Sequence, residues 1–200
     1  GRKLAFVTDF FGAVWTIELS STPTLASGNN PIFVSNNAED LAITADERYL
    51  IVSDGSNVQP LVVIDIESRT QIGTFDPASD HNSIAVTADG SVLVTSSRNT
   101  EVRRFTIDSS GTLADTGELL DIGGPVNVYA APVGPTGVVI RFRTVSSFTV
   151  AGLTLISSQT NPHTPSNYQS AVFSPDGTRL YVRADGAGNS GFIDVWGYDP

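Results

Sequence analysis

Residues 174–182 read Ser-Pro-Asp-Gly-Thr-Arg-Leu-Tyr-Val, a turn centred on an aspartate followed by an apolar run of β-forming residues. The same combination occurs at Thr44-Ala45-Asp46 and at Thr87-Ala88-Asp89-Gly90. The three aspartates lie 43 and then 87 residues apart, which is one period and then two. A unit of this length cannot bury its own apolar faces, so it must stack against copies of itself. The stretch therefore predicts a repeat protein, although it does not indicate a function.

Four strand-like segments occur in each period, separated by turns rich in Asp, Asn, Gly, Ser and Thr. No window of helical length carries a 3.6-residue apolar stripe. We therefore predict an all-β fold, a β-propeller built from four-stranded antiparallel blades of about 43 residues. A β-sandwich would have seven to nine strands without a common period. The predicted strands are Leu41–Ala45, Tyr49–Ser53, Leu61–Ile66 and Gln71–Phe75, then Ser83–Ala88, Ser91–Ser96, Glu101–Ile107 and Glu118–Ile122, then Gly137–Phe142 and Ser147–Val150, then Ser170–Phe173, Arg179–Val182 and Phe192–Trp196.

The repeat register also predicts how the chain is divided. Lys3–Asp9 aligns with the second strand of a blade, and the last strand aligns with a third, so we expect 18 strands. Full blades are expected at about 36–79, 80–123 and 124–166, with blade remnants at 1–35 and 167–200. Because the two remnants do not complement each other, we expect four to five blades that belong to a seven-bladed ring. A five-bladed ring with imperfect closure is the alternative.

Composition narrows the classes of partner. The 200 residues include 11 basic and 21 acidic side chains, a net charge of −10 that repels phosphate backbones, so nucleic acid is disfavoured. No run approaches the roughly 18 apolar residues of a membrane span. The absence of cysteine excludes disulfides and thiolate metal sites. We expect no metal and no cofactor, because His81 and His163 each lack a locally spaced second ligand.

The motif in residues 174–182 resembles the YVTN repeat, whose blades carry a Ser-Pro-Asp-Gly turn before a Leu-Tyr-Val strand. Val62-Val63-Ile64-Asp65 is similar to the third strand of that repeat, and the segment Glu101–Leu113 is similar to lactonase-type seven-bladed propellers. The resemblance implies a propeller fold and an exported protein, located outside the cell, in the periplasm or at the cell surface. It leaves function open, because the family includes surface-layer and secreted proteins, cofactor-linked dehydrogenase subunits and sugar lactonases.

Two conspicuous motifs are interpreted as scaffold. The repeated Asp46, Asp89 and Asp176 sit where a carboxylate accepts hydrogen bonds from backbone N–H groups of a hairpin turn; cation binding is the alternative. Gly90 and Gly177 supply the positive φ that such turns require. Residues 186–191 match G-x-G-x-x-G, but a strand follows them where a dinucleotide site needs a helix, so we interpret them as a hairpin loop.

The remaining candidates are residues outside the repeated pattern. Six polar residues fall at or beside the start of an innermost strand, which in a propeller faces the central channel: Asp40, His81, Asn82, Asn127, Tyr168 and Gln169. They are predicted to form a ligand-binding ring, or else to solvate the channel mouth and cap the strands. Arg141 and Arg143 are expected to alternate on one face of a strand and are candidates for binding an anion or for pairing with carboxylates.

The sequence favours a binding or interaction scaffold, with a protein or a small molecule as its ligand. A lactonase-type hydrolase with His81 as general base is a second hypothesis, although the sequence leans away from an enzyme. A structural cell-surface module that self-associates through open blade edges is a third.

Overall fold

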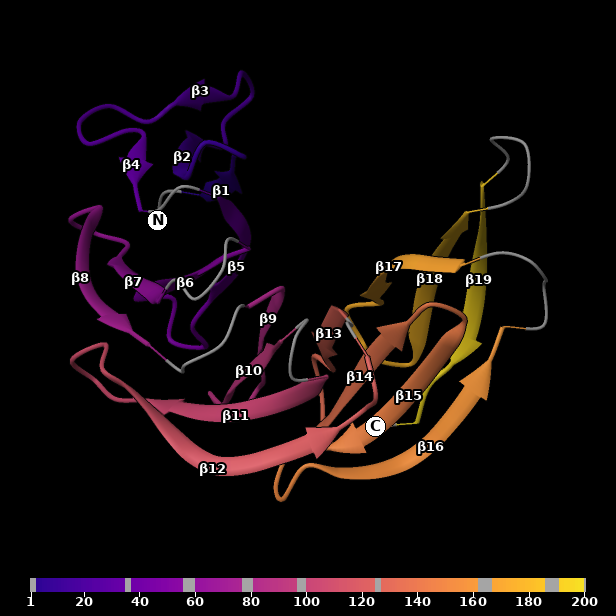
Figure 1. The fold of residues 1–200 in the computed structure, drawn as a ribbon. Coiled ribbons are helices and arrows are strands. Elements are labelled where there is room, and N and C mark those ends of the chain that lie inside the picture. The colour runs from indigo at the N-terminus through magenta and orange to yellow at the C-terminus, as the bar shows by residue number, and fades with distance from the viewer. Residues whose placement is uncertain are drawn as a thin grey trace.

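The computed structural model describes residues 3–34, 37–55, 60–76, 81–96, 100–124, 127–161, 167–185 and 191–199. The regular secondary structure of these described residues consists of β-strands. The strands form five antiparallel sheets that follow one another around an open arc (Figure 1). The fold is therefore an all-β propeller of five blades. The predicted blade type and the predicted four to five blades are confirmed, and the described residues form five blades rather than seven.

Each sheet is formed by strands that are consecutive in the sequence. The first contains β1 (Leu4–Thr8), β2 (Ala13–Glu18), β3 (Thr24–Leu25) and β4 (Ile32–Phe33), and the second β5 (Ala38–Ile43), β6 (Tyr49–Asp54), β7 (Leu61–Asp65) and β8 (Thr70–Phe75). The third contains β9 (Ser83–Val86), β10 (Val92–Thr95), β11 (Glu101–Ile107) and β12 (Leu113–Asp121). The fourth contains β13 (Asn127–Ala130), β14 (Thr136–Arg141), β15 (Thr144–Thr149) and β16 (Thr154–Thr160), and the fifth β17 (Asn167–Phe173), β18 (Arg179–Asp185) and β19 (Gly191–Gly197).

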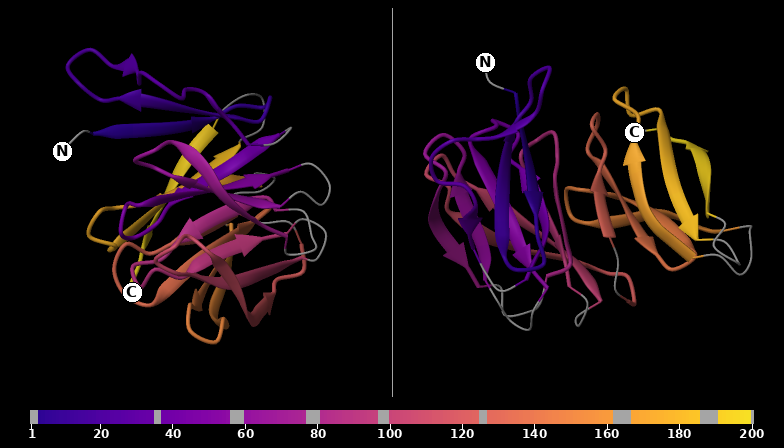
Figure 2. Two further views of the ribbon diagram at one scale, coloured as in Figure 1. Left: turned by 90° about the vertical axis from the view of Figure 1, so that its left-hand side faces the viewer. Right: turned by 90° about the horizontal axis from the view of Figure 1, so that it is seen from above.

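The core lies between neighbouring blades. Four apolar clusters fill the spaces between the first and second, second and third, third and fourth, and fourth and fifth sheets. Phe105 and Phe148 are the largest of their fully buried side chains. The first and last blades stand at opposite ends of the arc (Figure 2). Stacking between blades, as the repeat predicted, is thus what buries the apolar faces.

The aspartate turns have the predicted hairpin role. The Oδ1 atoms of Asp46, Asp89 and Asp176 accept a hydrogen bond from the backbone N–H two residues further on, at 3.1–3.2 Å. Gly90 and Gly177 adopt φ of 83° and 72° in these turns. The turn of the second blade has Glu47 at the corresponding position, with φ of 58°, where an L-residue is strained.

The first blade differs from the prediction. The described residues form 19 strands, where 18 were expected, because β3 and β4 pair with opposite ends of the same side of β2. Between them the side-chain amide of Asn30 takes the place of a strand: its Oδ1 accepts from Thr16 N–H and its Nδ2 donates to Thr16 C=O, both at 2.9 Å. The fourth position of this sheet is therefore filled by two short strands joined through a side chain.

Candidate functional site

An open pocket of about 590 Å³ lies on the inner side of the arc. The innermost strands β5, β9, β13 and β17 lie side by side in chain order and form its wall (Figure 1). Four of the six predicted channel residues line it, namely Asp40, Asn82, Asn127 and Gln169. The repeat thus placed these residues at or beside the start of the innermost strand on four successive blades.

Two β-bulges position Asp40 and Gln169, the first and the last of these four residues along the chain. The pairing register shifts between Ala38 and Leu41 in β5 and between Tyr168 and Ser170 in β17, so Asp40 and Gln169 both lie at a bulge. At the first bulge Ser53 Oγ accepts from the Asp40 N–H at 3.1 Å and donates to the Asp40 C=O at 3.3 Å. Bulges commonly redirect a side chain out of the regular strand alternation.

Asp40 begins a hydrogen-bond chain across three blades, with Ser83 in its middle. Its Oδ2 accepts from Ser83 Oγ and from the Ile84 N–H, both at 2.9 Å, and Ser83 Oγ in turn accepts from the Val128 N–H at 3.3 Å. Burial nevertheless raises the pKa of the Asp40 carboxyl, because the lost hydration outweighs these hydrogen bonds. Asp40 is therefore a partly buried carboxylate with an incompletely compensated charge.

The other side of the pocket is held by amides and a phenol. Asn127 Nδ2 donates to the Gln169 backbone carbonyl at 2.9 Å, which joins the fourth blade to the fifth. Tyr129 lies half-buried in the same wall, and burial raises the pKa of its hydroxyl, with the charge of Asp40 adding to the shift. These neutral groups bring hydrogen-bonding capacity to the wall without adding charge.

His81 and Tyr168 lie elsewhere. His81 is 2% exposed and is not part of the pocket wall, so the structure does not place it at the channel surface. Tyr168 lines a smaller neighbouring pocket of about 260 Å³ together with Asn82 and Asn127. Its hydroxyl donates to Asp194 Oδ2 at 2.9 Å, and burial raises its pKa. The predicted ring of six is therefore a wall of four residues with Tyr168 beside it.

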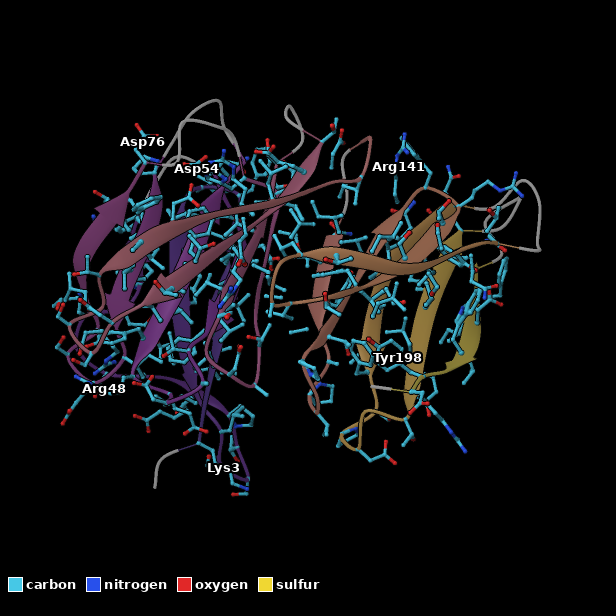
Figure 3. All side chains as sticks on the ribbon, turned by 90° about the horizontal axis from the view of Figure 1, so that it is seen from below. Lys3, Arg48, Asp54, Asp76, Arg141 and Tyr198 are labelled. Atoms are coloured by element: carbon cyan, nitrogen blue, oxygen red, sulfur yellow. The ribbon has the colours of Figure 1, made fainter. Side chains whose placement is uncertain are left out.

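The arginine prediction was wrong in its geometry. Arg141 is the last residue of β14, whereas Phe142 and Arg143 form the following turn, with Phe142 at φ of 43°. Arg141 donates to the Ile122 carbonyl and Arg143 to the Asn161 carbonyl, each at 3.3 Å. Figure 3 shows Arg141 and Asp54, each at the end of the second strand of its blade, along the same side of the arc. The arginines therefore tie loops to the blade and do not share a strand face.

The remaining motifs give no second site among the described residues. No three His, Asp or Glu side chains come together there in a way that suits a metal ion. Of the G-x-G-x-x-G segment only Gly191 is described, and it begins strand β19; residues 186–190 and His163 lie outside the described part. No helix among the described residues has the length and apolar character needed to cross a membrane.

Sequence reasoning did not identify Ser83, Glu39 and Tyr129 as parts of the pocket wall. Ser83 carried a usable signal, because it lies 43 residues after Asp40, one period along the chain. A polar residue at the same register in two successive blades indicates a side-chain contact between their inner strands.

No protein-family model and no curated protein matches the chain. Its fold is similar to a protein of unknown function from Desulfotomaculum acetoxidans, with 22% identity and a TM-score of 0.75 over 96% of this chain and 65% of that one. It is also similar to hydrazine synthase of Kuenenia stuttgartiensis, with 22% identity and a TM-score of 0.70 over 86% of this chain and 49% of that one. The chain thus spans less than two thirds of the length of either protein, and the likeness shows the propeller fold alone.

Proposed function

We propose that the chain is a binding scaffold that holds a small ligand, or one side chain of a protein partner, in the pocket on the inner side of the arc. The observation that carries the proposal is the pocket of about 590 Å³, whose wall combines polar and apolar side chains. Ligand sites in proteins also combine apolar surface with polar groups and fall in a volume range of roughly 300–1,000 Å³. The burial of His81 gives a hydrolase hypothesis no support at this wall.

A screen of small fragments of mixed charge, followed by backbone amide chemical shifts, tests this proposal. We expect the shifts of hits to cluster on β5, β9, β13 and β17. Ser170→Trp, which puts a large side chain on the pocket wall, should abolish binding. Ser158→Trp, on the exposed outer strand β16, should leave it unchanged. If no fragment of any charge shifts the pocket residues, the pocket is not a binding site and the proposal fails.

We also propose that these blades belong to a YVTN or lactonase-like seven-bladed ring of an exported protein. The motif in residues 174–182 supports the family, and the open arc together with the greater length of both similar proteins supports a larger ring. The coding sequence on either side tests this directly. Further repeats at the same spacing and an export signal are expected, and a coding sequence that lacks both would contradict it.

Self-association is a second candidate, favoured by the last blade. Strand β19 pairs with β18 alone among the described strands, and Ile193 and Val195 on it are 66% and 58% exposed. An exposed strand edge with apolar side chains is a template for pairing with another chain. Light scattering should show a mass that rises with concentration and falls for Val195→Lys. A mass that stays monomeric at all concentrations would eliminate this candidate.

A further inference from the structure

The charge of the pocket wall is one-sided. Among the described residues that line it, Glu39 and Asp40 are acidic and none is Lys, Arg or His. The other polar side chains there, such as Asn82, Asn127 and Gln169, are neutral. Because Asp40 is partly withdrawn from water and its pKa is raised by burial, its negative charge has less solvation than that of a surface carboxylate. An anion placed beside Asp40 would therefore be repelled by this carboxylate.

The pocket is also divided along its length. The polar residues lie at the starts of the inner strands, where Asp40, Asn82 and Asn127 are found. The ends of β9 and β17 present Val86 and Phe173 to the pocket, and Ser174 and Pro175 line it just beyond β17. Since the wall carries its carboxylates at one end and its apolar surface at the other, a complementary ligand has a cation at one end and an apolar body.

We propose that this pocket binds a protonated amine with an apolar body, with its ammonium group beside Asp40 and Glu39 and its body along the apolar ends of β9 and β17. The inference rests on the proposed function and adds the chemical class of the ligand. An ammonium has three N–H donors, which suit the carboxylates and the amide oxygens of the wall. The ring of Tyr129 in the same wall provides an additional surface that attracts cations.

The pairing is favoured by the partly buried position of Asp40. Two opposite charges attract more strongly where water is partly excluded than on an open surface. Without a ligand, the Asp40 carboxylate has lost hydration that its hydrogen bonds do not fully replace. A cation bound beside it would therefore stabilise the ionised carboxylate. The apolar body adds the burial of its own surface. An anion with the same body gains only the burial and is repelled by the Asp40 carboxylate, whereas a neutral analogue gains the burial without that repulsion.

Three ligands of nearly equal size isolate the role of charge: benzylamine, benzyl alcohol and benzoate, each titrated into the purified 200-residue chain at pH 7 and followed by backbone amide shifts. We expect benzylamine to shift the amides of Asn82, Asn127 and Gln169 with at least tenfold higher affinity than benzyl alcohol. Benzoate should cause no shift there. Raising the salt concentration should weaken benzylamine binding, because part of its attraction is electrostatic.

Variants identify the carboxylates. Asp40→Asn should weaken benzylamine at least tenfold and leave benzyl alcohol unchanged. Because Asp40 also joins the blades, Glu39→Gln provides a second test on an exposed side chain, with about threefold weakening expected. Glu67→Gln, on an exposed turn away from this wall, is the matched control and should have no effect.

The outcomes separate the two proposals. If benzoate or benzyl alcohol binds the pocket as tightly as benzylamine, or if neither carboxylate variant changes benzylamine affinity, the amine inference is wrong and the binding scaffold stands. If benzylamine shifts only residues outside the pocket while other fragments occupy it, the amine inference is again wrong. If no ligand of any charge reaches the pocket, both proposals fail together.

Discussion

Removing the hydroxyl of Ser83 should weaken the joint between three blades. In Ser83→Ala, Asp40 loses one of its hydrogen-bond donors and the buried Val128 N–H loses its acceptor. A hydrogen bond to a charged group contributes about 1.5–3 kcal/mol, and an unsatisfied buried amide costs about 1–3 kcal/mol. With partial relaxation we expect the free energy of unfolding to fall by about 3 kcal/mol. At roughly 2–4 °C per kcal/mol for a chain of this size, Tm falls by about 6–12 °C.

Urea unfolding at pH 7 measures this change, and Ser157→Ala is the matched control. Ser157 makes a hydroxyl–hydroxyl hydrogen bond to Ser147 at 2.8 Å on the exposed outer strand β16, so the same truncation should cost less than about 0.5 kcal/mol there. In combination with Asp40→Asn, the Ser83→Ala cost should be less than additive, because the two side chains form one network. If Ser83→Ala and Ser157→Ala unfold within about 0.5 kcal/mol of each other, the hydrogen-bond chain does not join the blades and the reasoning is refuted.

Three further substitutions test other parts of the fold. Glu47→Gly should raise the free energy of unfolding by about 0.5–1 kcal/mol in the same urea assay, because glycine removes the strain of a positive φ at a small entropic cost. Gly137→Ala should lower it by about 1–3 kcal/mol, since a Cβ there would lie 2.6 Å from the buried ring of Phe148. Asp176 has its pKa lowered to about 2, mainly by the Ser174 hydroxyl, so its contribution to stability is present above about pH 4 and is lost as pH falls towards 2. Asp176→Asn should therefore flatten the acid limb of a plot of stability against pH.

Controls and contrary results are specific to each substitution. Gly73→Ala, on strand β8 with open space around the new Cβ, should stay within about 0.5 kcal/mol of the parent. Equal losses at Gly73 and Gly137 would show that the contact with Phe148 is not the cause. A Glu47→Gly variant less stable than the parent would show that the turn is not strained. An acid limb unchanged by Asp176→Asn would assign the loss of stability to other carboxylates.

The sequence predicted those parts of the fold that depend on local chemistry. The turns at Asp89 and Asp176 were identified because the turn residues and the strands that follow them are adjacent in the chain. The start of β12 at Leu113 was missed, since the polar residues Asp115 and Thr116 that continue it are typical of a loop in sequence and become a strand only by pairing with β11. The Asn30 amide that takes the place of a strand was also missed, because its role depends on hydrogen bonds to Thr16, 14 residues away in the sequence.

The candidate site was predicted in part because register alone places residues around the inner side of the arc. Asp40, Asn82, Asn127 and Gln169 were found in this way. The register cannot tell whether a side chain points into the pocket or into the blade, however. The direction of Asp40 and Gln169 depends on the bulges of β5 and β17. The position of His81 depends on packing, which buries this side chain inside the protein.

The hydrogen bonds between inner strands have a consequence for how like blades recognise their neighbours. The second and third blades meet through Asp40 and Ser83, whereas the fourth and fifth meet through Asn127 and a backbone carbonyl. Repeat proteins are prone to misassembly, because similar units can dock in the wrong order. These two joints are chemically distinct, so a third blade docked beside the wrong partner would leave Ser83 without the Asp40 carboxylate. The differences between repeats at these positions thus favour the native order of these blades, while the shared aspartate turns give the second, third and fifth blades the same hairpin.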